Sequence, residues 1–335
     1  MSEIVNRRRN IFINSEQYHD SKGHVKLIFP GNDFAVDKNE HMRISLESFT
    51  MARNFYNVNA NNNTFYVRDK SASTHTYTEV VIQAGDYATF DGTNTSMGEA
   101  IENALDDAGF SNSTVTYDTN TRLYKIDMSN ASNWSSNHDF VCFQITDNSA
   151  PPTNVSSSGK FNDSCELLGG RPTKSSTNIK SAFTTNGSSV FTGVYPASLY
   201  TLKAIHMRTN LQTHSYQTPN FDANRENSSL IPSDIFAKIF VSHHEANVFT
   251  PEKGLIQYSD NGANAFAIDL QNKTLPEITI RLTDDKGREL PATENQHADG
   301  NLSYLATLKW TAISSPMIGK ETGMPRPDLQ MKLYN

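Results

Sequence analysis

Strand signals dominate this chain of 335 residues, and they fall into two groups on either side of a different middle. The early group is residues 24–29, 42–47 and 64–68, and the late group is residues 199–207, 235–241, 265–270, 278–282 and 303–310. Residues 42–47 alternate apolar and polar side chains, a pattern that turns one face of a strand inward and the other outward. Three early strands and five late ones make eight, the number in a jelly-roll sandwich.

The middle of the chain holds the only strong helix signal. Ser96 and the Glu three residues later have the spacing of a capping box. Ile101 and Leu105 lie on one apolar stripe of a helix expected over residues 97–108, and Gly109 supplies a left-handed stop. Strands are expected on both sides of this helix, at residues 77–82, 114–117, 123–128 and 140–145. The middle is therefore predicted to be a small α+β module.

Together these signals predict a mainly β fold, a jelly-roll β-sandwich with an inserted α+β module. The expected organisation is an N-terminal arm at 1–10, a sandwich at 11–70 plus 195–315, the inserted module at 71–194 and a C-terminal tail at 316–335. Hydrophobic residues make up 36% and charged residues 19%, and Ser, Thr and Asn are dense from about residue 94 to 189. That composition suits short strands joined by polar turns.

Charge, hydropathy and cysteine content exclude several classes of protein. A net charge of −7 argues against a dedicated nucleic-acid coat, which needs a broadly basic face. No apolar run is long enough to span a bilayer, and the first residues lack the apolar core of a secretory signal peptide. We therefore expect a protein made and used in the cytoplasm or nucleus. Cys142 and Cys165 are too few for a disulfide framework, and Cys142 is expected to be a buried thiol in a strand.

No catalytic constellation, cofactor motif or metal site rises above background, so we expect no enzyme activity and no cofactor. The His-His-Glu run at 243–245 is a poor metal site, because neighbouring residues on a strand point to opposite faces. Asp284, Asp285 and Glu289 lie near a turn and lack the ligand spacing of a calcium loop, so a turn is the favoured interpretation.

Arg7, Arg8 and Arg9 form a basic cluster on an otherwise acidic chain. They are either a solvated tail or an arm that binds phosphate or an acidic partner. Since no helix or strand pattern includes them, we expect an inward-facing tether for the packaged genome or an acidic neighbour.

Several segments, taken in chain order, resemble one family of viral proteins. They are residues 10–16, 44–50, 55–58, 61–66, 81–87, 115–118, 167–169 and 280–287. The pattern is similar to that of the penton (vertex) and minor capsid proteins of virophages and large eukaryotic DNA viruses. The resemblance implies a single jelly roll, a homopentamer at the capsid vertex of the virion, and contacts with neighbouring major and minor capsid proteins.

Other functions remain open at this stage. The chain is alternatively a minor cement protein of the virion, a receptor- or carbohydrate-binding spike, or a hydrolase on a β scaffold. A carbohydrate-binding module would show an exposed aromatic platform or a calcium site. Trp310 lies in a strand expected in the core, whereas Trp134 lies in a polar loop where such a platform is conceivable.

Overall fold

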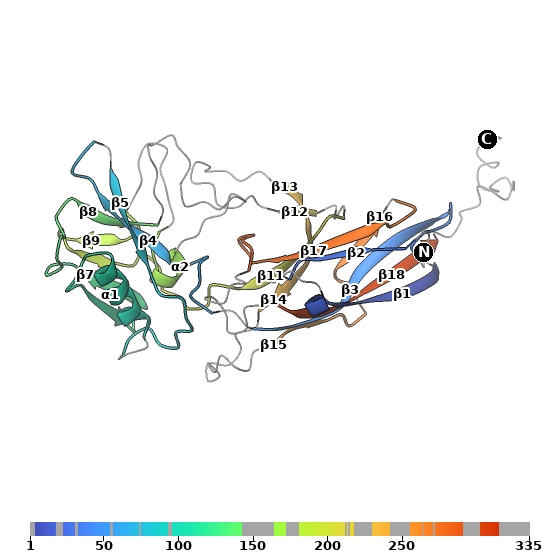
Figure 1. Cartoon of the computed structure of the whole chain (residues 1–335), viewed down its shortest axis with the longest axis horizontal. Helices are drawn as coiled ribbons and strands as arrows, with labels where there is room; N and C mark the ends of the chain where they lie inside the picture. Colours follow the sequence, from blue (N-terminus) through green and yellow to red (C-terminus); the bar gives the residue numbers. More distant parts are fainter. Residues whose placement is uncertain are drawn as a thin grey trace, which may run out of the picture.

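The computed structural model describes residues 4–17, 23–30, 33–53, 56–73, 75–92, 96–142, 164–171, 181–211, 213, 215–217, 230–241, 255–262, 264–270, 272–290 and 302–314. Figure 1 shows two lobes along the long axis of the molecule, a β-sandwich and a smaller lobe that carries the longer helix. No helix of the described segments is long and apolar enough to cross a membrane.

The first sheet of the sandwich is built around its longest strand, β3, and is named the β3 sheet. Its members, in spatial order, are β1 (Ile4–Asn14), β18 (Tyr304–Ser314), β3 (Glu40–Ala52) and the pair β15 (Leu255–Ser259) and β16 (Ala267–Leu270), which both bond to β3. All pairings are antiparallel. Met42, Ile44 and Leu46 face the core before a β-bulge, and Phe49 and Met51 face it after the bulge.

The second sheet, named the β17 sheet, covers the other side of the core. Its spatial order is β14 (Ile235–Phe240), β11 (Ala204–Thr209), β17 (Glu277–Thr283) and β2 (Val25–Ile28). Ile205, Met207, Ile278, Ile280 and Leu282 alternate with polar residues and are buried against the β3 sheet. A short hairpin of β12 (Ser215–Gln217) and β13 (Ile231–Ser233) lies outside both sheets.

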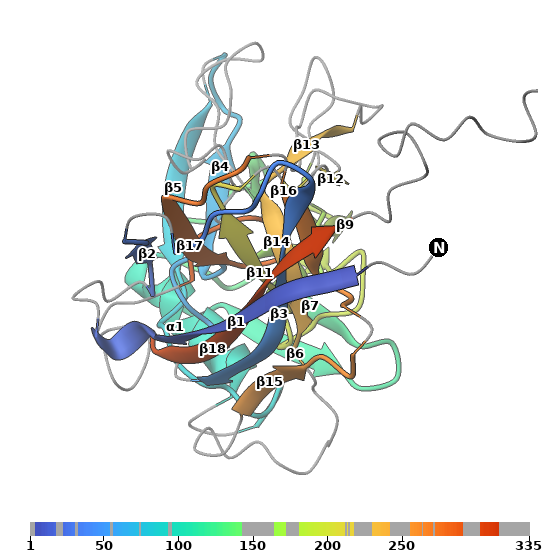
Figure 2. The ribbon, with the colours of Figure 1, turned by 90° about the vertical axis from the view of Figure 1, so that its right-hand side faces the viewer.

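The strand order is that of a jelly roll. With β15 and β16 counted as one interrupted strand, each sheet has four positions among the described strands, and consecutive sandwich strands alternate between the sheets except β11 and β14, which are neighbours in the β17 sheet. Figure 2 shows β1 and β18 side by side, although they come from opposite ends of the chain. Trp310 of β18 is fully buried between the sheets. The predicted mainly β fold with a jelly-roll sandwich is confirmed.

One strand of the predicted eight was assigned wrongly, and one was missed. Residues 64–68, expected in the sandwich, form β4 (Thr64–Asp69) of the smaller lobe. Their place in the β3 sheet is taken by β1, part of which was expected to be a free arm. The run that contains Arg7, Arg8 and Arg9 is polar, so its sequence carries none of the apolar alternation that marks the other strands.

The described residues of the smaller lobe form two sheets and two helices. One sheet has the order β5 (Thr76–Val81), β4, β8 (His138–Val141), and the other has the order β6 (Thr114–Asp118), β7 (Leu123–Asp127), β10 (Val190–Thr192), β9 (Thr184–Asn186). The helices are α1 (Met97–Asp107) and the short α2 (Cys165–Leu168), and a 3₁₀ turn, η1 (Ser15–Gln17), follows β1 of the sandwich.

Helix α1 forms where its sequence predicts it. The Glu99 backbone N–H donates to Ser96 Oγ over 3.2 Å, which is the first half of the expected capping box. The reciprocal contact is not made by Glu99 Oε2, which is buried without a hydrogen-bond partner in the described segments. Ile101 and Leu105 are fully buried, and Gly109 ends the helix with φ of 92°.

Each lobe has its own hydrophobic core. The core of the smaller lobe draws on residues between 58 and 199, and that of the sandwich on residues 13–51 and 205–312. We therefore propose that the insertion begins between residues 51 and 58, earlier than residue 71, and ends between residues 199 and 205. The expected tail at 316–335 and the His-His-Glu run at 243–245 lie outside the described residues.

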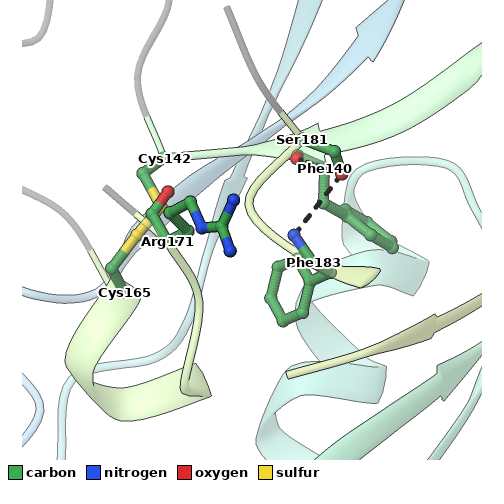
Figure 3. The surroundings of a disulfide bond; sticks show 6 residues. All are labelled: Phe140, Cys142, Cys165, Arg171, Ser181 and Phe183. Carbon is green, nitrogen blue, oxygen red and sulfur yellow. Dashed lines mark hydrogen bonds between the residues drawn. A yellow bond between two sulfur atoms is a disulfide. The ribbon is translucent and has the colours of Figure 1, made fainter. Parts of the chain in front are cut away.

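A disulfide joins Cys142, directly after β8, to Cys165 at the start of α2 (Figure 3). The expectation of a buried free thiol at Cys142 was wrong. The two residues are 23 apart in sequence, and only the fold brings their Cα atoms to 6.2 Å. Beside the bridge, Ser181 Oγ donates to the Phe140 carbonyl (3.3 Å) and accepts the Phe183 N–H (3.4 Å). These bonds connect the segment before β9 to β8.

Candidate interaction surface

The three arginines of the expected arm lie in β1, with alternate side chains on opposite faces of the β3 sheet. Arg7 and Arg9 extend over the rim of the sandwich core. The guanidinium carbon of Arg7 lies 5.9 Å from the Trp310 ring centroid, and that of Arg9 lies 5.4 Å from the Phe34 ring centroid. The expectation that no strand includes these arginines was wrong. The side chains of Arg7 and Arg9 cover aromatic rings of the core, a position that an apolar side chain usually takes in such a strand.

Arg7 binds a buried carboxylate. Its Nη2 donates to Glu40 Oε2 over 2.7 Å, and Asn6 Nδ2 donates to Glu40 Oε1 over 2.6 Å. The backbone N–H of Asp37 donates to Glu40 Oε2 over 3.0 Å. These bonds, the Asp37 N–H first and then Asn6 and Arg7, lower the pKa of Glu40 to about 2. The start of β1 is therefore fastened to the start of β3 by a charged group that is only 8% exposed.

A β-bulge supplies the partner of Arg8. The ladder between β3 and β18 skips Glu47, which lies between the paired residues Leu46 and Ser48. The Glu47 side chain accepts a 2.7 Å hydrogen bond from Arg8 Nη2. Because both side chains are partly exposed, this pair contributes no more than about 1 kcal/mol.

Arg9 completes the row. Its Nη1 lies 3.9 Å from Asp33 Oδ1, and both side chains are about half exposed. Each of the three arginines therefore has a carboxylate of its own chain within ion-pair distance. A phosphate or acidic partner would have to compete with these carboxylates, and binding of such a partner by Arg7, Arg8 and Arg9 stays a prediction.

Exposed apolar side chains follow a diagonal across the outer face of the β3 sheet. Phe12 of β1, Leu305 of β18 and Leu255 of β15 are 78%, 56% and 62% exposed. Phe12 is paired with Thr307, two residues from Leu305 and on the same face, so the two apolar side chains are diagonal neighbours. We name these residues, together with Ala52, the outer-face stripe.

The stripe continues across β3 without a break. Leu305 pairs with Thr50 of β3, and Leu255 pairs with Ala52, two residues further along the same face. The exposed apolar residues of the β17 sheet are far apart by comparison: Ile28 and Phe240 lie on its two opposite edge strands. Single exposed apolar residues are normal on a protein surface, whereas an aligned set marks a contact surface. The outer-face stripe is therefore the candidate interaction surface of the sandwich.

The stripe reaches an open sheet edge. Among the described strands β1 pairs only with β18, so its other side presents unpaired backbone groups over much of its length. Charged side chains protect the first half of this edge, where Arg7, Arg8 and Arg9 lie. The second half carries Phe12 and has no such protection, so it is the part of the edge suited to contact another chain.

The described segments also bear on the metal and calcium sites considered from the sequence. No group of three or more His, Cys, Asp or Glu side chains there is arranged to hold a metal ion. The turn expected near Asp284 is confirmed: the Gly287 N–H donates to the Asp284 carbonyl over 3.0 Å, and the Asp284 carboxylate accepts from Arg288 Nε over 2.7 Å. Burial lowers the pKa of His206 to about 4, but this ring lies on a sheet face with Arg208 and Lys238 as charged neighbours.

Trp134 is not an exposed platform. Its half-buried ring packs against the rings of Phe110, Phe140 and Phe191, with centroids 5.9, 5.2 and 5.3 Å away. The tryptophan that the sequence places in a polar loop therefore belongs to the core of the smaller lobe, where aromatic pairs of this geometry add stability.

Comparisons with known proteins give only distant likenesses. No family model matches the chain, and no curated protein matches it. Among solved structures, the mavirus penton protein is 11% identical, with a TM-score of 0.37 over 91% of this chain and 98% of that one. A chain of the Sputnik virophage, from its cryo-EM structure, is 12% identical, with a TM-score of 0.33 over the same shares. At this level of similarity the jelly-roll assignment rests on the strand order.

Proposed function

We propose that this chain is a structural protein of a viral shell, and specifically the vertex (penton) protein of an icosahedral DNA virus. The observation that carries the proposal is the outer-face stripe on a jelly-roll sandwich. A sandwich that leaves Phe12, Leu305 and Leu255 in water is suited to burying them against another chain. The motif resemblance to penton and minor capsid proteins supports the same conclusion from the sequence.

The proposed assembly is a cyclic homopentamer in which the sandwiches contact one another and the smaller lobe projects away from the contact. A ring closes through a head-to-tail interface, in which one surface of each subunit meets a different surface of the next. The two-lobed shape fits this arrangement, because the stripe lies on the sandwich (Figure 1). In the virion the ring would contact neighbouring major and minor capsid proteins.

Native mass spectrometry and negative-stain microscopy of the purified chain test the proposal. The parent is expected to form five-membered rings. The double variant Phe12→Ser with Leu305→Ser is expected to be monomeric, because it places two hydroxyls at the centre of the contact. Phe240→Ser is the matched control, since Phe240 is 69% exposed on the other sheet. A stable trimer, or rings that survive the double variant unchanged, would contradict the proposal.

A further inference from the structure

The β17 sheet carries a cavity on the face that points away from the core. Its volume is about 660 Å³, within the range of sites that bind small molecules or peptide side chains. The wall includes side chains from three neighbouring strands: Lys26 of β2, Arg208 of β11 and Arg281 of β17. Among the described residues of that wall, Asp234 is the only carboxylate. A basic cavity is unexpected on a chain whose net charge is −7.

The two arginines are directly opposite each other in the ladder between β11 and β17. Like charges in such a position repel, so a negatively charged group is needed to offset the repulsion between the two guanidinium groups. Asp234 does so by accepting from both: Arg208 Nη1 donates to Oδ1, and Arg281 Nη2 donates to Oδ2 over 2.7 Å. One carboxylate balances only one of the two guanidinium charges, which leaves an unbalanced positive charge facing the cavity.

The guanidinium group of Arg208 is fixed in place. Its Nε donates to Thr283 Oγ1 over 2.9 Å, and its side chain is only 7% exposed. Arg281 is 51% exposed and stands at the mouth of the cavity. A rigid inner arginine with an accessible outer one is a suitable arrangement for bidentate binding of a planar oxyanion.

We propose that this cavity binds a carboxylate side chain of an acidic peptide segment from another protein chain. Both guanidinium groups donate to the carboxylate of Asp234, so their geometry already suits a carboxylate. The volume favours a peptide segment over a bare ion, because a phosphate alone would leave most of the cavity empty. The site lies on the opposite sheet from the outer-face stripe, so it is separate from the surface proposed for ring formation.

Fluorescence polarisation with a labelled hexaglutamate peptide tests the proposal on the full chain. The peptide is expected to bind, and hexaglutamine is expected not to. Arg281→Gln should weaken hexaglutamate binding about tenfold, while Arg122→Gln, an exposed arginine of the smaller lobe, should leave it unchanged. If Arg281→Gln does not fold, Lys26→Gln replaces it, with a loss of a few-fold expected because Lys26 already pairs with Glu277.

Removing the internal competitor gives a gain-of-binding test. Asp234→Asn frees both guanidinium groups and should tighten hexaglutamate binding several-fold. Asp269→Asn, which removes one negative charge from the β3 sheet, should not change it. Equal effects of these two variants, equal losses from Arg281→Gln and Arg122→Gln, or no binding at millimolar peptide would overturn the proposal. Inorganic phosphate that binds as tightly as the peptide and with the same variant pattern would overturn the peptide as occupant.

Discussion

Glu40 provides the sharpest test of how the N-terminal strand is held. The perturbation is Glu40→Gln, which keeps the size of the side chain and removes its charge. The parent carboxylate accepts hydrogen bonds from Arg7, Asn6 and the Asp37 N–H, all of 3.0 Å or less, whereas the neutral amide offers one acceptor oxygen in place of two and no ion pair with Arg7. Since these contacts fasten β1 to β3, the variant should destabilise the sandwich.

The magnitude follows from the pKa of Glu40, which the fold lowers from 4.5 to about 2. With each pKa unit worth about 1.4 kcal/mol, the carboxylate contributes up to roughly 3 kcal/mol at pH 7. A lowered pKa means that this stability is present above pH 4.5 and is lost as the pH falls toward 2. At pH 3 roughly 1 kcal/mol should remain.

Urea denaturation at pH 7 and pH 3 measures both values. Trp310 reports on the sandwich, and a Trp134→Phe background removes the signal of the smaller lobe. The matched control is Glu47→Gln, whose partner Arg8 is largely exposed, so a cost of no more than about 1 kcal/mol is expected at either pH. The reasoning is refuted if both variants cost the same, or if the cost of Glu40→Gln is as large at pH 3 as at pH 7.

Three further predictions concern the smaller lobe. Leu105→Ala should lower the free energy of unfolding of this lobe by about 2–5 kcal/mol, since the side chain is fully buried. Thermal denaturation followed by circular dichroism measures the effect, and an unchanged melting temperature would contradict the prediction. Asp139→Ala should cost more than about 1 kcal/mol in urea titrations, because it removes the two hydrogen bonds that Arg68 Nε and Nη2 donate to the buried Asp139 carboxylate; a smaller loss would contradict a stabilising buried ion pair. Reducing the Cys142–Cys165 bridge should cost about 3 kcal/mol, and thiol labelling of the unreduced protein should give no reaction at either residue.

The elements that the sequence predicted well share a local signal. Helix α1 is specified within fourteen residues by a cap at Ser96, an apolar stripe and a stop at Gly109, so no distant contact is needed to recognise it. Trp310 was expected in the core because its strand alternates clearly. Residues 64–68 were also recognised as a strand, but local pattern does not tell which lobe a strand joins, and β4 was therefore assigned to the wrong one.

The interaction surface was accessible to sequence reasoning only in part. Arg7, Arg8 and Arg9 stand out as a charge cluster, yet their strand was missed because its stability comes from distant partners such as Glu40. The outer-face stripe has no sequence signal at all. It exists because the register of the sheet brings Phe12 beside a residue that lies nearly three hundred positions later in the chain.

The pairing of β1 with β18 also determines when, during synthesis, the outer-face stripe can form. During synthesis β1 leaves the ribosome long before β18, and its partner strand is complete only when residue 314 has been made. Pairings of such large sequence separation form late, because the loop between them must close first. Phe12 and Leu305 therefore become neighbours only on chains that include β18. A shell built through that surface would therefore exclude chains that terminate before β18.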